Sequence, residues 1–176
     1  MKFYIALLVM GILTQNFVLS KFLGICPFLG VSKKLNTAVG MSAAVIFVML
    51  LATAVTYPLN VLLVNNGLDY LQTIVFILVI AALVQMVEIV LKKYIKSLYN
   101  ALGIYLPLIT TNCAILGAAI LCIQNGYNLI ESITFSFGSA VGWTMAIVIF
   151  AGVRARVNFA EPPKCFKGTP IALVTA

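Results

Sequence analysis

Two of the four cysteines, Cys26 and Cys113, stand in matching pentapeptides and carry the side chains best suited to chemistry in this sequence. Residues 26–30 (CPFLG) and 113–117 (CAILG) share the pattern C-x-x-L-G. Thiolates are the usual ligands of iron–sulfur clusters, and a [2Fe–2S] cluster takes four of them. One chain with two equivalent cysteines therefore offers half of a ligand set. We hypothesise that Cys26 and Cys113 bind a [2Fe–2S] cluster that a second subunit completes.

The spacing alone also leaves a plainer interpretation of these cysteines open, because free cysteine often packs as a small buried hydrophobe. Cys122 and Cys165 lie outside the repeated pattern, and we expect them to be structural. They are expected on opposite sides of the membrane, where no disulfide can join them. The sequence has no histidine, which excludes His-ligated haem, His-containing zinc sites and Ser-His-Asp or Cys-His nucleophiles.

The residues around both cysteines predict breaks in the helices that carry them. The run from residue 3 to residue 32 is too long for one straight helix across a hydrocarbon core of about 30 Å. Proline is favoured as a first helical residue, so we expect a half-helix to begin at Pro27 with Cys26 at its cap. Residues 110–112 (TTN) are capping types and predict a similar restart at Cys113. A helix N-terminus stabilises a thiolate, which makes it a ready metal ligand.

The composition requires a membrane environment for these helices. Hydrophobic residues make up 63% of the chain and charged residues only 9%, whereas soluble domains carry roughly 25% charged residues. We therefore predict an all-α integral membrane protein with six transmembrane helices. Its apolar runs cover residues 3–20, 35–68, 71–91, 97–130, 132–153 and 169–176, and the last run is so short that we expect the sixth helix to be cut short. Turns are expected at residues 57–58, 65–67, 124–126 and 162–163.

Basic residues predict the orientation of these helices. They gather in alternate connections, at Lys33 and Lys34, at Lys92, Lys93 and Lys96, and at Arg154, Arg156, Lys164 and Lys167. By the positive-inside rule these connections are cytoplasmic, which places the N-terminus outside. The net charge of +7 is thus explained by topology, and we expect no nucleic-acid partner.

The matching cysteine motifs also predict an internal repeat. We expect a single membrane domain over residues 1–176, with repeat one at about 1–93 and repeat two at about 97–176. Each repeat would hold three helices, so the two cross the membrane in opposite senses, with the first and fourth helices broken. Such inverted repeats are common in transporters. A secondary transporter without a redox centre and a scaffold for other subunits are therefore alternatives.

A few polar residues inside the apolar runs are weaker candidates. Glu88 is an intramembrane carboxylate and so a functional candidate, but a surface pair with Lys92 is the favoured interpretation. Glu131 is expected to cap the fifth helix. Three amides are expected to satisfy freed backbone groups, with an ion path as the alternative: Gln15, Asn16 and Asn112. No Walker or Rossmann glycine motif occurs, which assigns nucleotide chemistry to other subunits.

Long stretches of the chain resemble the A-type subunits of Rnf electron-transport complexes. The resemblance is carried by residues 15–34, 73–85 and 101–113, and it extends through residues 166–172. The D-type and E-type subunits of the sodium-translocating NADH:quinone reductase are similar but match less closely. The resemblance implies a six-helix inverted-repeat subunit that pairs with its paralogue, the Rnf E-type subunit, to hold a membrane-embedded [2Fe–2S] cluster. It assigns Cys26 and Cys113 as this chain's ligands.

The resemblance also implies a role in a larger assembly. Such complexes pass electrons between ferredoxin and NAD and move Na⁺ or H⁺ across the bacterial or archaeal plasma membrane. This chain would be an electron-carrying subunit without catalytic residues or independent catalysis, in contact with membrane lipid and with Rnf subunits B, C, D and G. The small residues beside Cys113 are expected to let the partner approach closely: Gly117, Ala118 and Ala119.

Overall fold

The computed structural model describes residues 2–32, 35–94 and 106–158, and its regular secondary structure in these ranges is entirely helical. The elements are α1 (Lys2–Val9), a π-helical turn η1 (Met10–Thr14), α2 (Ile25–Val31), α3 (Leu35–Asn65), a 3₁₀ turn η2 (Asp69–Leu71), α4 (Gln72–Tyr94), α6 (Leu106–Thr110), α7 (Cys113–Gln124) and α8 (Leu129–Asn158). The predicted all-α class is confirmed. The predicted sixth helix and Cys165 lie outside the described residues, so the count of six helices stays a prediction.

Three of these helices are long and apolar enough to cross a membrane by themselves: α3, α4 and α8. Shorter apolar helices cover residues 2–14 and 108–124. At about 1.5 Å per residue, neither short helix reaches across a core of about 30 Å alone. The arrangement is that of an integral membrane protein that combines three continuous spans with broken ones in the described residues.

Both predicted helix breaks are present. The first apolar run leaves helical geometry after Thr14 and resumes at Ile25, while the fourth is interrupted between Thr110 and Cys113. The expectation that Pro27 begins the new half-helix is wrong by two residues, because α2 begins at Ile25. Proline is tolerated there since the first few N–H groups of a helix have no intrahelical acceptor.

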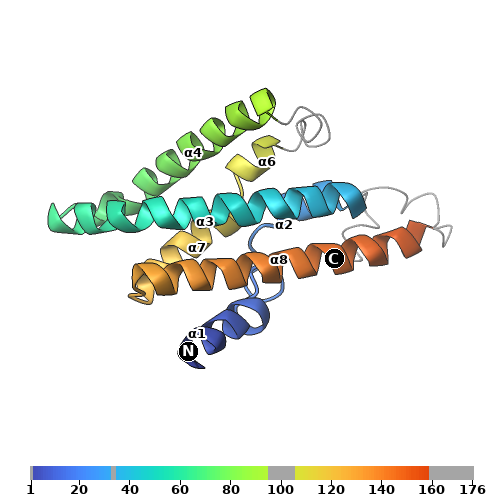
Figure 1. Ribbon diagram of the computed structural model, residues 1–176, viewed down its shortest axis with the longest axis horizontal. Coiled ribbons are helices and arrows are strands. Elements are labelled where there is room, and N and C mark those ends of the chain that lie inside the picture. Colours follow the sequence, from blue (N-terminus) through green and yellow to red (C-terminus); the bar gives the residue numbers. More distant parts are fainter. Residues whose placement is uncertain (1, 33–34, 95–105, 159–176) are drawn as a thin grey trace.

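Helices α3 and α8 pack side by side at the centre of the molecule. In Figure 1 the N-terminal end of α3 and the C-terminal end of α8 point to the same side, so the two helices are antiparallel. A buried hydrogen bond of 2.8 Å joins Thr53 Oγ1 on α3 to Ser136 Oγ on α8. In an inverted repeat, the second helices of the two halves run in opposite directions, as α3 and α8 do. The repeat itself stays a prediction.

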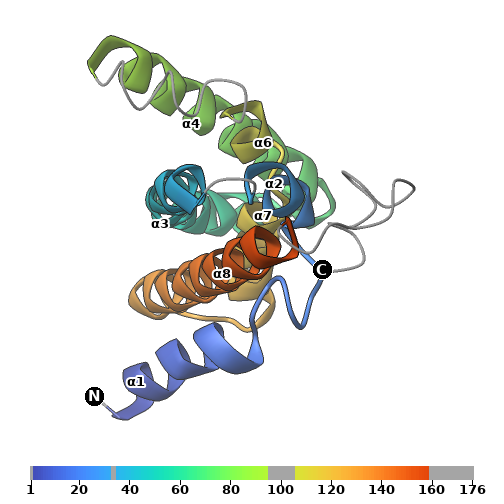
Figure 2. The ribbon, with the colours of Figure 1, turned by 90° about the vertical axis from the view of Figure 1, so that its right-hand side faces the viewer.

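Figure 2 shows α4 on one side of the α3–α8 pair and α1 on the other, with the short helices α2 and α7 between them. Two glycines on α8 allow α1 and η1 to approach closely. A Cβ at Gly138 would lie 2.8 Å from Leu8 O, and one at Gly142 would lie 2.8 Å from Ile12 O. Small residues serve the same purpose in many membrane helix pairs.

Several predicted boundaries need correction. Tyr57 and Pro58 do not form a turn, because α3 continues through them to Asn65. The turns expected at residues 65–67 and 124–126 are confirmed, with positive φ angles at Gly67 and Gly126. Four of the basic residues predicted in connections lie within helices instead, near their C-terminal ends: Lys92 and Lys93 in α4, and Arg154 and Arg156 in α8. The others lie outside the described residues: Lys33, Lys34, Lys96, Lys164 and Lys167.

Candidate functional site

Cys113 is the first residue of α7, directly after the cap of that helix. Asn112 has extended backbone geometry, and its side-chain oxygen accepts a 3.1 Å hydrogen bond from the Ala114 N–H. This is the capping arrangement expected from residues 110–112. The Cys113 thiol is half-buried and accepts a hydrogen bond from the Gly24 N–H at 2.9 Å. The sulfur of the second motif therefore contacts the backbone that leads into the first.

Cys26 is the second residue of α2 and is exposed. The residue that caps α2 is Gly24, whose φ of 79° lies in the left-handed region. Two Cα–Cα steps span at most about 7.6 Å, so Cys26 lies close to the Gly24 contact with Cys113. The structure thus brings together the two motifs, which are 87 residues apart in the sequence.

The donor set here fits half of a thiolate-ligated cluster. Both thiols are free of disulfide bonds, and the Gly24 N–H is directed at one of the sulfurs. Backbone N–H groups directed at cluster sulfurs are a known means of tuning such centres. Within the described ranges, no three metal-binding side chains gather in one place. Two further thiolates for a four-sulfur cluster must then come from outside these residues.

Cys113 also borders an open hollow of about 320 Å³ beside α7. Lys21 and Leu23 line it from the first break, and Leu116, Gly117 and Ile120 line it from α7. The expectation that Ala118 and Ala119 contact a partner is wrong, because this chain's own helices bury both residues. Leu23 also occupies the space beside Gly117, where a Cβ would lie 2.7 Å from Leu23 Cδ1.

Asn16, at the first break, serves the backbone as expected. Asn16 is fully buried, donates to Ile12 O and Gly142 O, and accepts from the Val18 N–H. It therefore replaces hydrogen bonds that the helix loses at its break. Gln15 Oε1 and Asn112 Nδ2 are buried without a hydrogen-bond partner among the described residues, so the ion-path alternative stays open for these two atoms.

Of the two carboxylate candidates, Glu131 has its predicted role and Glu88 stays untested. Glu131 Oε2 accepts a 3.0 Å hydrogen bond from the Asn128 N–H, which confirms its capping role at the start of α8. Glu88 is half-buried on α4, and its pairing with Lys92 stays a prediction. Cys122 is buried, with its sulfur 3.8 Å from Ser136 Oγ, as a structural cysteine would be.

Sequence reasoning missed three residues that shape the site. Gly24 contacts Cys113, and the Trp143 indole N–H on α8 donates to Gly24 O at 3.4 Å. Arg154 is buried rather than in a loop and donates to Leu29 O at 3.0 Å and to Ser32 Oγ at 2.7 Å, at the end of α2. In the sequence, Trp143 is marked by being the single tryptophan and Arg154 by being a charge at the end of an apolar run. Only the fold shows which residues they contact.

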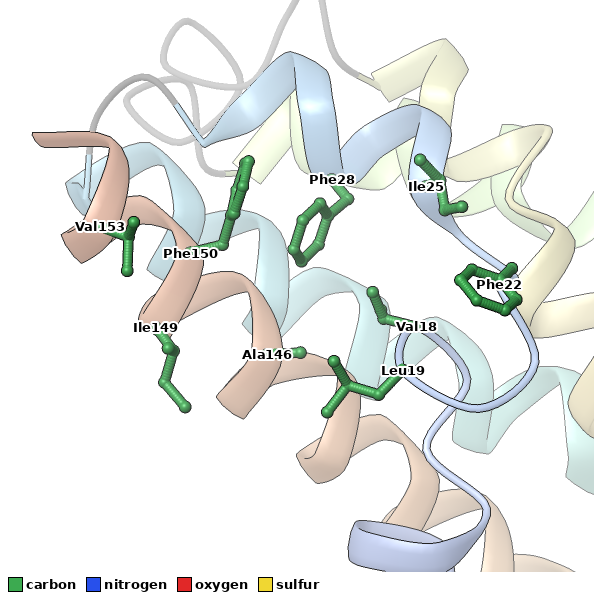
Figure 3. Close-up of a pocket in the computed structure, with 9 residues that line it drawn as sticks. All are labelled: Val18, Leu19, Phe22, Ile25, Phe28, Ala146, Ile149, Phe150 and Val153. Carbon is green, nitrogen blue, oxygen red and sulfur yellow. The ribbon is translucent and has the colours of Figure 1, made fainter. Parts of the chain in front are cut away.

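A second hollow, of about 410 Å³, lies beside α2 and borders α8. Figure 3 shows that the side chains lining it carry only carbon, among them Phe28 and Phe150. The rings of these two residues stack with centroids 4.6 Å apart. Such a surface provides packing and no reactive group, so the candidate chemistry stays at the two cysteines.

Comparison with known proteins agrees with this picture. The family model described as "Rnf-Nqr subunit, membrane protein" matches residues 4–176. The A-type subunit of the Na⁺-translocating ferredoxin:NAD⁺ oxidoreductase complex of Acetobacterium woodii is 58% identical, over 98% of this chain and 90% of that protein. The A-type subunit of the ion-translocating oxidoreductase complex of Syntrophotalea carbinolica is 55% identical, over 100% and 92%. That of Thioalkalivibrio sulfidiphilus is 52% identical, over 98% and 91%. The chain therefore belongs to the Rnf-Nqr family of membrane subunits.

Proposed function

We propose that this chain is the A-type subunit of an ion-translocating ferredoxin:NAD oxidoreductase complex, with no independent catalysis. The names of its relatives support this role, since they are described as the corresponding subunits of such complexes. They favour the redox subunit over a solute transporter without a redox centre. Within the complex, the chain would carry electrons through the membrane while other subunits bind the nucleotide.

The carrier in this proposal is a [2Fe–2S] cluster shared with a homologous subunit, with Cys26 and Cys113 as this chain's ligands. The observation that supports it most is the 2.9 Å contact between the Gly24 N–H and Cys113 Sγ. It joins Cys113 of the second motif to the residue that caps the helix of the first motif, at the breaks of two helices. When bound, the cluster takes up and releases single electrons.

The residues of this chain would stabilise the charge of such a centre. Thiolates and an added electron are costly in a low-dielectric surrounding unless dipoles face them. The Gly24 N–H supplies one such dipole, and a hydrogen bond to a charged group contributes about 1.5–3 kcal/mol. In the proposed coupling, a change of charge at the Cys26 and Cys113 ligands would favour opening of the repeats toward one side of the membrane, and Na⁺ or H⁺ would move as a result.

The proposed partner across the cluster is the paralogous Rnf E-type subunit, with subunits B, C, D and G elsewhere in the complex. The hollow beside Cys113 supports a partner there, because it leaves one side of that residue open. The proposed location is the plasma membrane with the N-terminus outside. In Figure 1 the C-terminal ends of α4 and α8, which carry basic residues, both point toward the right of the view, as the positive-inside rule requires of cytoplasmic ends.

Substitution of the two ligands in the intact complex tests this function. Cys26→Ser and Cys113→Ser are each expected to lower the iron content by about two atoms per complex and to remove one EPR signal. Cys122→Ser is the matched control, because this cysteine is buried away from the site, and it should retain both iron and signal. Unchanged iron and EPR in the first two variants would overturn the proposal.

A further inference from the structure

Trp143 is the only tryptophan in the sequence and is fully buried on α8. A buried indole N–H needs an acceptor. Its acceptor here is Gly24 O, at 3.4 Å. Helix α8 thereby reaches the backbone at the start of α2, 119 residues away in the sequence.

Gly24 lies between this indole and the sulfur of Cys113. Its N–H donates to Cys113 Sγ at 2.9 Å, and its carbonyl accepts from Trp143. A Cβ at this position would lie 2.8 Å from Trp143 Nε1 and 3.1 Å from Asn112 Oδ1. The two peptide groups that flank Gly24 are thus held from both sides, one by a sulfur and one by an indole.

We propose that Trp143 is a positioning residue for the metal ligands. By holding the Gly24–Ile25 peptide, its indole keeps the Gly24 N–H directed at Cys113 Sγ and fixes the start of the helix that carries Cys26. This inference rests on the proposed function, because the sulfurs it positions are the proposed cluster ligands. It adds a determinant of redox potential on a helix that contributes no ligand.

The direction of the effect follows from charge. An N–H group directed at a ligand sulfur stabilises the more negative, reduced form of a cluster more than the oxidised form. Loss of the indole donor frees the Gly24 peptide and weakens the N–H to sulfur bond. The reduction potential should then become more negative, while the ligands themselves remain.

Trp143→Phe in the intact complex tests the inference, because phenylalanine keeps an aromatic ring and lacks the N–H. Iron analysis should show an unchanged iron content. EPR-monitored redox titration should show a roughly two- to tenfold shift of the reduction equilibrium of the cluster toward the oxidised form. A tenfold shift corresponds to about 59 mV for a one-electron couple. Ser136→Ala is the matched control, since it removes another buried hydrogen bond of α8, to Thr53, and should leave the potential unchanged.

Hydrogen exchange of the peptide that contains Gly24 gives a second readout that needs no cluster. Exchange should become several-fold faster in Trp143→Phe and stay unchanged in Ser136→Ala. If Trp143→Phe does not assemble, replacement of Trp143 by benzothienylalanine, in which sulfur replaces the indole N–H, removes the donor and retains the ring shape.

The outcomes separate the two proposals. Full iron content with unchanged potential and unchanged exchange would overturn the role of Trp143 and leave the proposed function intact. Retention of the cluster in Cys113→Ser would overturn the proposed function, and faster exchange at Gly24 would then still support the positioning of Cys113 by Trp143.

Discussion

Gly24 occupies a position where both the backbone and its surroundings exclude a side chain. Its φ of 79° is a left-handed conformation, which costs an L-residue roughly 1–2 kcal/mol. Its neighbours also leave no room, because an added Cβ would lie 2.8 Å from Trp143 Nε1. The contact with Cys113 therefore depends on the absence of a side chain at residue 24.

Gly24→Ala is expected to move the first break away from Cys113 and to lower the iron content of the complex by about two atoms. Gly126→Ala is the matched control, because Gly126 also has a positive φ, of 64°, but has nothing within 4 Å of its added Cβ. It carries similar backbone strain without the contact. Equal iron contents in the two variants would show that the close packing at Gly24 is not required.

The residues of the site were predictable from the sequence to different degrees. Cys26 and Cys113 stand out because a motif is repeated, and the cap at Asn112 follows from local preference. Gly24 does not stand out, and Trp143 stands out only as the single tryptophan. Their roles depend on a contact between residues 119 positions apart. Local patterns carry no information about which distant backbone group a buried indole meets.

Among the helices, α2 depends on a contact at its C-terminal end. Arg154 Nη1 donates to Leu29 O and Ser32 Oγ there. Cations are favourable at the C-terminal ends of helices, where carbonyls lack intrahelical donors. This contact joins α8 to the end of α2 opposite the one that carries Cys26.

Arg154→Gln is expected to lower the free energy of unfolding by about 2–3 kcal/mol, because two hydrogen bonds from a charged donor are lost. Denaturation of the purified complex in mixed micelles measures this loss. Arg156→Gln is the control, since Arg156 is exposed on the same helix, and its effect should stay within about 0.5 kcal/mol. Equal losses in the two variants would contradict the role of Arg154.

The sequence predicts the existence of these elements better than their ends. Both breaks follow from proline and capping residues, but α2 begins two residues before Pro27 because the turn at Gly24 starts it. Helix α8 extends past Val153 to Asn158. A charge normally ends an apolar span, but here α2 supplies acceptors for Arg154.

Among the described residues, the antiparallel pair of α3 and α8 supports both broken helices, because α1 packs against α8 and α7 packs mainly against α3. Composition alone predicts a membrane protein of several helices, and the described residues confirm it. The packing of α1 and η1 against Gly138 and Gly142 was not predictable, because these glycines also fit an ordinary span. The repeat organisation stays a prediction based on two short motifs, and we expect two halves of one chain to meet at Cys26 and Cys113.

The most direct measurement of the central claim is the iron and acid-labile sulfide content of this chain purified together with its homologous partner. Two cysteines per chain predict about two iron and two sulfide atoms per pair, and none in this chain purified alone. Absence of iron from an intact, co-purified pair would contradict the account, as would a complete cluster in this chain by itself.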